Sequence, residues 1–331
     1  MPSTDMTATG TTRRRFIAIV GAVAGAALVP RTGSAAVRPH HWRGVALGAP
    51  ASIQLLHPDP SEARRIIELA VAEIERLEMI FSLYRSDSAV TALNRAGRLD
   101  LPPIELVDVL ARAREVSRSS GGAFDVTVQP LWRRYRDHFA ADAAAASAPD
   151  VSDVLPLVDW RAVTAGPDAV ALDRPGMAVT LNGIAQGYVT DRIADLLRRN
   201  GVERVLLDLG ETRSLGTATD GRAWRIGIAD PADPARVLAR LDCVDGAVAT
   251  SGGYGTVFDR GGRHSHLIDP RDGRTAPVRR GVTVAAAEAA AADAWSTAFA
   301  LMAADEIRAV AATIGGLGVY VSEQGGFVRL A

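Results

Sequence analysis

The chain has 331 residues, of which 48% are hydrophobic, and its 37 basic and 38 acidic residues give a formal net charge of -1. This length allows one large domain or two small ones, and the composition is typical of soluble globular proteins. The near-neutral charge excludes the basic footprint of a nucleic-acid-binding protein. All 37 basic residues are arginine, which also excludes a Walker A phosphate loop and a Schiff-base lysine.

The first 36 residues have the organisation of an export signal. A basic cluster at Arg13–Arg15 precedes an apolar stretch, Phe16–Val29, which is too short to span a bilayer comfortably. Small residues follow, so we expect cleavage after Ala36. The adjacent arginines favour the twin-arginine route, with a Sec signal or an uncleaved anchor as the alternative. We therefore expect a periplasmic protein, with a signal peptide at 1–36, one domain at 37–331 and no membrane span after cleavage.

Helical periodicity then appears in four segments of the chain. Apolar residues recur at helical spacing over Ser61–Tyr84, from Pro102 to a stop at Gly121, from Gln186 to a stop at Gly201, and over Ala290–Leu301. The Ala-rich stretch 139–154 interrupts this pattern, and we expect it to be a surface insertion.

Short runs rich in β-forming residues lie between these helices. Their Gly, Pro and Asp boundaries predict strands at 204–210, 224–230, 246–252 and 265–270, and a closing hairpin at 318–331. Because helices and strands mix without a regular βαβ rhythm, the predicted class is α+β, in a single compact domain. The single cysteine, Cys243, excludes an intramolecular disulfide and is expected in the core beside a strand.

Two glycine-containing stretches suggest places where the backbone approaches a ligand. In Gly121–Pro130, the two glycines allow close approach or positive φ, and Phe124 with Asp125 could sandwich and orient a ring. In Thr180–Arg192, a loop runs straight into a helix whose free N–H groups suit a phosphate. The alternative for each is an ordinary turn, into a strand in the first and into a helix in the second.

A third stretch, Ala249–Pro277, contains two histidines at a spacing of two. On a strand, His264 and His266 would point the same way, but no further His or Cys lies nearby to complete a zinc site. His266, before an apolar pair, is either a general base or a hydrogen-bonded histidine on a strand.

The fourth stretch places Asp293 and Thr297 on one face of an otherwise apolar helix. Their oxygens suit a hard cation such as Mg²⁺, which takes few protein ligands together with phosphate oxygens and water. The alternative is a Thr297 hydroxyl bonded to the backbone, with Asp293 on an exposed face.

Seven segments, taken in order, resemble the ApbE family of FAD:protein FMN transferases. They are FSLYRSDSAVTALN, GGAFDVTVQPLW, LNGIAQGYVTDR, LLDLGETRSLG, ATSGGYGTVFD, HLIDPRDGR and ADAWSTA. The resemblance covers nearly all of residues 37–331 and implies a single ApbE-like domain. It also implies an enzyme that cleaves FAD with Mg²⁺, attaches FMN by a phosphoester to a Thr or Ser of a target flavoprotein, and releases AMP.

The resemblance also implies roles for individual residues. His266 matches the histidine regarded as the catalytic base. The Mg²⁺ ligands would be the Gly183 backbone oxygen, Asp293 and Thr297. Contacts to FAD would come from Leu47, Tyr84, Ala123, Phe124, Asp125, Thr180, Gln186 and Ile268.

Three positions depart from the family pattern. An acidic residue is common where Thr180 stands, Lys or Glu where Gln186 stands, and Met where Leu47 stands. The segments LNGIAQGYVTDR and DLGETRSLG resemble the branch associated with nitrous-oxide reductase, whose target is a membrane-bound flavoprotein regulator of that enzyme. A non-catalytic FAD carrier and an FAD pyrophosphatase are the alternatives to a transferase.

Overall fold

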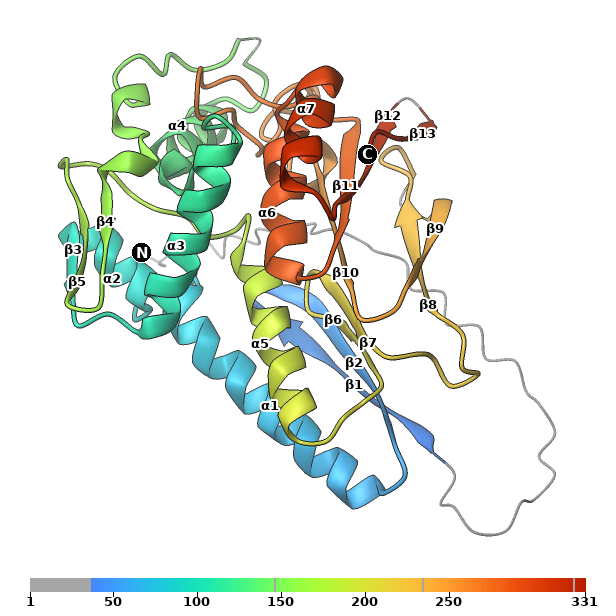
Figure 1. Cartoon of the computed structure of the whole chain (residues 1–331). Coiled ribbons are helices and arrows are strands. Elements are labelled where there is room, and N and C mark those ends of the chain that lie inside the picture. The colour runs from blue at the N-terminus through green and yellow to red at the C-terminus, as the bar shows by residue number, and fades with distance from the viewer. Residues whose placement is uncertain (1–36, 146, 234, 324) are drawn as a thin grey trace, which may run out of the picture.

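The computed structural model describes residues 37–145, 147–233, 235–323 and 325–331 (Figure 1). The expected signal peptide at 1–36 lies outside these ranges. Inside them, no helix combines the length and the apolar character needed to cross a bilayer.

An eight-stranded antiparallel sheet forms the frame of the molecule and lies behind the central helices in Figure 1. Its strands, in spatial order, are β1 (Arg38–Ala46), β2 (Ala49–His57), β6 (Val205–Asp208), β7 (Thr212–Leu215), β10 (Ala247–Gly252), β11 (Arg280–Ala286), β12 (Gly318–Glu323) and β13 (Gly326–Arg329). All six residues of β10 are buried, because helices cover one face of the sheet and a two-stranded ribbon packs against the other.

Three helices cover the inner face of this sheet: α1 (Pro60–Phe81), α5 (Ala185–Arg199) and α6 (Ala289–Ala300). The helix α1 begins where the Asp59 carboxylate accepts the backbone N–H groups of Ser61 and Glu62. Its buried residues, among them Ile66, Ala70, Ile74 and Leu77, recur every three or four positions and form one apolar stripe.

The remaining elements surround this core. They are α2 (Ala89–Ala96), α3 (Ile104–Ser119), α4 (Gln129–Ala141) and α7 (Ala304–Ile314), a small sheet of β3 (Arg98–Asp100), β5 (Ala169–Leu172) and β4 (Val163–Ala165), the ribbon of β8 (Trp224–Ala229) and β9 (Val237–Cys243), and 3₁₀ turns at Val126–Val128, Leu155–Leu157, Trp160–Ala162 and Gly253–Gly255. The α+β class is therefore confirmed, as are the closing hairpin and the buried position of Cys243 at the end of β9.

The strand predicted at 265–270 is wrong. Only isolated bridges, Val257 to Ser265 and Ile268 to Thr275, connect this segment to its neighbours. The chain reverses directly after Pro270, where the Asp269 N–H donates to the Arg274 carbonyl at 2.7 Å. This tight turn stops the segment from extending along a strand partner. The predicted helix Ser61–Tyr84 also ends earlier, at Phe81.

The helices α5 and α6 approach each other closely at Gly187. A Cβ at Gly187 would lie 2.2 Å from the Ala289 carbonyl oxygen, so only glycine fits there. The Gly187 N–H donates to Asp293 Oδ2 at 3.1 Å. In return, Asp191 of α5 accepts the N–H groups of Ala289 and Ala290 at 2.8 and 2.9 Å and caps α6. The two helices are thus joined by reciprocal hydrogen bonds.

We expect Gly187→Ala to lower the free energy of unfolding by about 1–3 kcal/mol, because the added methyl group forces α5 and α6 apart. Urea denaturation measures this change. Gly166→Ala is the matched control, since the contact nearest to its Cβ would be at 3.9 Å. Equal stability of the two variants would contradict the close contact between the helices.

Candidate active site

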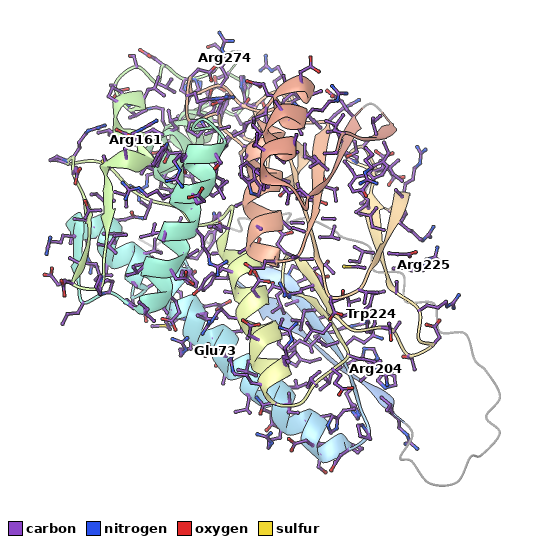
Figure 2. All side chains as sticks on the ribbon, in the orientation of Figure 1. Glu73, Arg161, Arg204, Trp224, Arg225 and Arg274 are labelled. Atoms are coloured by element: carbon purple, nitrogen blue, oxygen red, sulfur yellow. The ribbon has the colours of Figure 1, made fainter. Side chains whose placement is uncertain are left out.

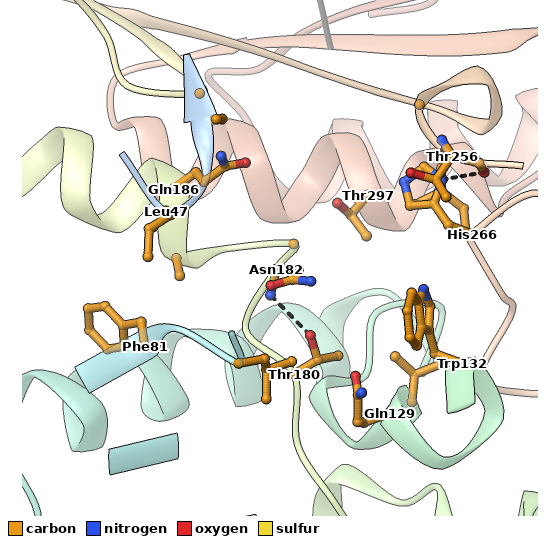
Figure 3. A pocket seen from close by; sticks show the side chains of 18 of the residues that line it. Leu47, Phe81, Gln129, Trp132, Thr180, Asn182, Gln186, Thr256, His266 and Thr297 are labelled. Carbon is orange, nitrogen blue, oxygen red and sulfur yellow. Dashed lines mark hydrogen bonds between the residues drawn. The ribbon is translucent and has the colours of Figure 1, made fainter. Parts of the chain in front are cut away.

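A cavity of about 760 Å³ opens beside the C-terminal end of α6 and is lined by segments from all parts of the domain. In Figure 3, Leu47, Phe81 and Gln186 lie at one end, and Trp132, Thr256 and His266 lie at the other. Thr180 and Asn182 lie between them, on the loop that leads into α5. The volume is in the range that buries a cofactor-sized ligand.

Eight of the twelve residues predicted for the site line this cavity. They are Leu47, Tyr84, Thr180, Gly183, Gln186, His266, Ile268 and Thr297. The other four, Ala123, Phe124, Asp125 and Asp293, are buried behind the wall. The fold therefore brings all twelve to one region, although they come from segments spread over residues 47–297.

The Ala123–Asp125 segment supports the cavity wall from behind. A Cβ at Gly183 would lie 3.2 Å from Phe124 Cε2, so the ring lies directly behind Gly183. The Asp125 carboxylate accepts the Thr127 N–H and hydroxyl at 2.7 and 2.6 Å and the Trp160 N–H at 2.9 Å. Burial raises the pKa of Asp125, and these donors oppose the shift. The Asp125 carboxylate therefore ties the Ala123–Asp125 segment to Thr127 and Trp160.

Leu47 lies at the turn between β1 and β2 in a left-handed conformation with φ of 48°, which is uncommon for a leucine. Its N–H donates to the Glu78 carboxylate of α1, which holds the turn in place. The side chain is only 8% exposed and faces the cavity. The turn therefore supplies a fixed apolar wall at this end.

Oxygen atoms gather where the loop before α5 meets α6. A Cβ at Gly183 would lie 3.1 Å from Thr297 Oγ1, so the backbone approaches this hydroxyl closely. Ser251 Oγ lies 3.0 Å from Thr297 Oγ1 and 2.8 Å from Ser296 Oγ. Asp293 is fully buried one turn before Thr297. The predicted alternative with Asp293 on an exposed face is therefore wrong.

This set of donors fits a hard cation such as Mg²⁺, which prefers carboxylate, hydroxyl and carbonyl oxygens. In the described ranges, no group of three or more His, Cys, Asp or Glu residues could hold a metal ion. Gly183, Asp293 and Thr297 are the residues that would hold such an ion.

His266 is held at the opposite end of the cavity by Thr256. Its backbone N–H donates to the Thr256 carbonyl at 3.0 Å, and its Nδ1 lies 3.1 Å from the same oxygen. In the tautomer that donates from Nδ1 to this carbonyl, Nε2 is the basic nitrogen. His264 does not line the cavity, and its ring stacks on Phe139 with centroids 5.1 Å apart.

The described residues that line the cavity include no Lys or Arg and a single carboxylate, Asp208. Arginines such as Arg161, Arg225 and Arg274 are instead exposed on the surface (Figure 2). Burial raises the pKa of Asp208 to about 6, opposed only by a hydrogen bond from the Gly210 N–H. The sequence analysis did not select Asp208, although its position where a β-rich run ends before a glycine could have indicated it.

Comparison with known proteins identifies the family of the chain. Residues 47–321 match the model described as the ApbE family. The chain belongs to the ApbE family. An FAD:protein FMN transferase of Klebsiella pneumoniae is 31% identical over 278 residues, which are 78% of this chain and 81% of the relative. One of Treponema pallidum is 31% identical over 270 residues, 73% of this chain and 72% of the relative.

Solved ApbE structures also share the fold. The flavin transferase ApbE of Vibrio cholerae superimposes with a TM-score of 0.75 at 26% identity, over 88% of this chain and 96% of the other. The ApbE protein of Thermotoga maritima gives a TM-score of 0.76 at 26% identity, over 88% and 97%. The predicted single ApbE-like domain is therefore confirmed.

We expect Asp208→Asn to stabilise the ligand-free ApbE domain at neutral and basic pH. The fold raises the pKa of this carboxyl from 3.8 to about 6, so the ionised form opposes folding above pH 6 and has no effect well below pH 4. A shift of about two pKa units corresponds to roughly 3 kcal/mol at pH 8. Denaturation at pH 8 and pH 4 measures the difference. Asp242→Asn, at an exposed site, is the control. A gain in stability of Asp208→Asn that does not depend on pH would contradict the raised pKa of Asp208.

Proposed function

We propose that the protein is an FAD:protein FMN transferase that uses Mg²⁺. The hydroxyl oxygen of a Thr or Ser in a target flavoprotein bonds to the FMN phosphorus of FAD. The pyrophosphate P–O bond to AMP breaks, and AMP leaves with the bridging oxygen. The observation that carries the proposal is a single cavity that is lined by His266 at one end and also by Gly183 and Thr297. This cavity lies in an ApbE domain whose relatives are named FAD:protein FMN transferases.

The charge balance of the cavity supports the metal. The pyrophosphate of FAD is anionic, and no Lys or Arg among the described lining residues can neutralise it. Gly183, Asp293 and Thr297 would hold the ion. When bound, Mg²⁺ offsets the charge that develops on the departing phosphate. The N-terminus of α5 adds a positive dipole potential near the phosphate position, while the Ala185 and Gly187 N–H groups donate to the Leu181 carbonyl and to Asp293.

His266 accepts the proton of the attacking hydroxyl. Thr256 orients the ring through Nδ1, which lies 3.1 Å from its carbonyl oxygen and 3.2 Å from its backbone nitrogen. In the tautomer with the hydrogen on Nδ1, Nε2 takes the proton. Gln186 and Thr180 offer neutral hydrogen-bonding groups to FAD where the family commonly has charged ones. Binding at these positions therefore depends on hydrogen bonds and shape.

The cellular setting is part of the same proposal. The basic cluster and apolar stretch of residues 13–29 support export by the twin-arginine route, so the acceptor would be a periplasmic or membrane-bound flavoprotein. The segments LNGIAQGYVTDR and DLGETRSLG support a role in maturing the flavoprotein regulator of nitrous-oxide reductase.

We expect mature protein, FAD and Mg²⁺ to add one FMN to an acceptor domain with a candidate Thr, and EDTA to abolish the addition. Asp293→Asn should lower the rate at least a hundredfold at a given Mg²⁺ concentration, because it removes the single carboxylate of the proposed metal site. Mass spectrometry of the acceptor measures the transfer, with Asp242→Asn as the control. Full activity of Asp293→Asn would contradict its role, intact FAD alone would favour a carrier, and free FMN with AMP would favour a pyrophosphatase.

We expect His266→Ala to retain FAD binding within a few-fold and to lose about 10²–10⁴-fold in transfer rate, the range typical of a general base. His264→Ala is the matched control, since this residue lies two positions away and outside the cavity lining. Single-turnover transfer and a separate FAD titration measure the two effects. A similar loss of transfer in both variants, or none in His266→Ala, would exclude His266 as the base.

A further inference from the structure

Asp208 and Gln186 form one corner of the cavity. Asp208 is the last residue of β6, and the Gly210 N–H donates to its carboxylate. Gly210 has φ of 99°, and a Cβ there would lie 2.3 Å from the Gln186 amide nitrogen. The glycine therefore lets the Gln186 amide lie against the turn that holds Asp208. A carboxylate acceptor and an amide donor are brought to adjacent places on the cavity wall.

Within the described ranges, no residue forms an ion pair with Asp208. In the sheet it lies opposite Ser52 of β2 and Thr212 of β7, and α5 presents the neutral Gln186. Burial and the Gly210 hydrogen bond alone shift its pKa, with no charged group contributing. A half-buried carboxylate whose ionised form gains no cation opposes folding. Such a group is maintained against its effect on stability when a ligand uses it.

The same end of the cavity has apolar walls against which a flat ring can pack. Leu47 and Phe81 supply apolar walls, and Tyr84, which is 64% exposed, lies at the mouth. Both rings of FAD carry an N–H donor beside an acceptor on one edge, at N3 of the flavin and at the N6 amino group of adenine. A carboxylate next to an amide complements such an edge.

We propose that Asp208 determines the ligand specificity of this end of the cavity: its carboxylate accepts an N–H of the bound heterocycle, while Gln186 bonds the neighbouring acceptor. This inference rests on the proposed function, because it assumes that FAD occupies the cavity. It assigns a binding role to Asp208, which is not among the twelve site residues predicted from the sequence.

Binding of the two halves of FAD tests the inference. FAD, FMN and AMP are titrated separately at pH 8 with Mg²⁺ present, against wild type, Asp208→Asn, Asp208→Ala and the Asp242→Asn control. A charge-assisted hydrogen bond to a buried acceptor corresponds to about tenfold or more in affinity. In both Asp208 variants, we expect the affinity for FAD to fall at least tenfold, and the affinity for either FMN or AMP to fall by the same factor. The affinity for the other of these two ligands should change less than twofold. The half that loses affinity identifies the ring bound at this corner.

A methylated ligand provides the second measurement. N3-methyl-FMN, or N6,N6-dimethyl-AMP if adenine is the ring concerned, lacks the donor. It should bind wild type about as weakly as the parent ligand binds Asp208→Asn, with no further loss in the variant. Unchanged FAD affinity in both Asp208 variants, or equal weakening of FMN and AMP, would overturn this inference alone. A wild-type protein that binds no FAD would overturn the proposed function as well.

Discussion

The contact between α5 and α6 at Gly187 is the constraint on which the site depends. Without a side chain at this position, the two helices approach until the Gly187 N–H reaches Asp293 and Asp191 caps the N-terminus of α6. A buried ion pair with Arg213 of β7 holds Asp191 in turn. The loop before α5 and the face of α6 that carries Thr297 are thereby fixed relative to each other, and a shift of either helix would separate the oxygen donors.

Electrostatics distinguish the cavity from the rest of the molecule. Elsewhere, arginines pair with carboxylates near the surface, as Arg76 does with Glu73 at 2.7 Å, and such pairs contribute little to stability. The described lining of the cavity contains no basic side chain. Under the proposed function, the charge of the FAD pyrophosphate would be offset by Mg²⁺ and by the N-terminus of α5. Under the proposed function, binding of FAD would depend on Mg²⁺.

The two ends of the cavity are built for different tasks. At one end, Thr256 fixes the orientation of His266, which suits proton transfer. At the other, the strained turn at Leu47 and the corner at Gly210 hold side chains in fixed positions, which suits recognition of a ring. The Leu47 end also contains a group whose placement opposes folding, the Asp208 carboxylate, whose pKa is raised by burial. At this end, the proposed recognition of the ligand comes with a lower folding stability.

The sequence by itself determined the α+β class, the main helices and the closing hairpin, because local periodicity and end signals act over a few residues. Through family motifs it also selected eight residues that line the cavity. Only the tertiary structure decided that Ala123–Asp125 and Asp293 lie behind the wall, that 265–270 forms a turn and not a strand, and that Asp208 lines the cavity. The physical reason is that burial and hydrogen-bond partners arise from contacts between segments far apart in the chain, such as Gly187 with Ala289, which no local pattern encodes.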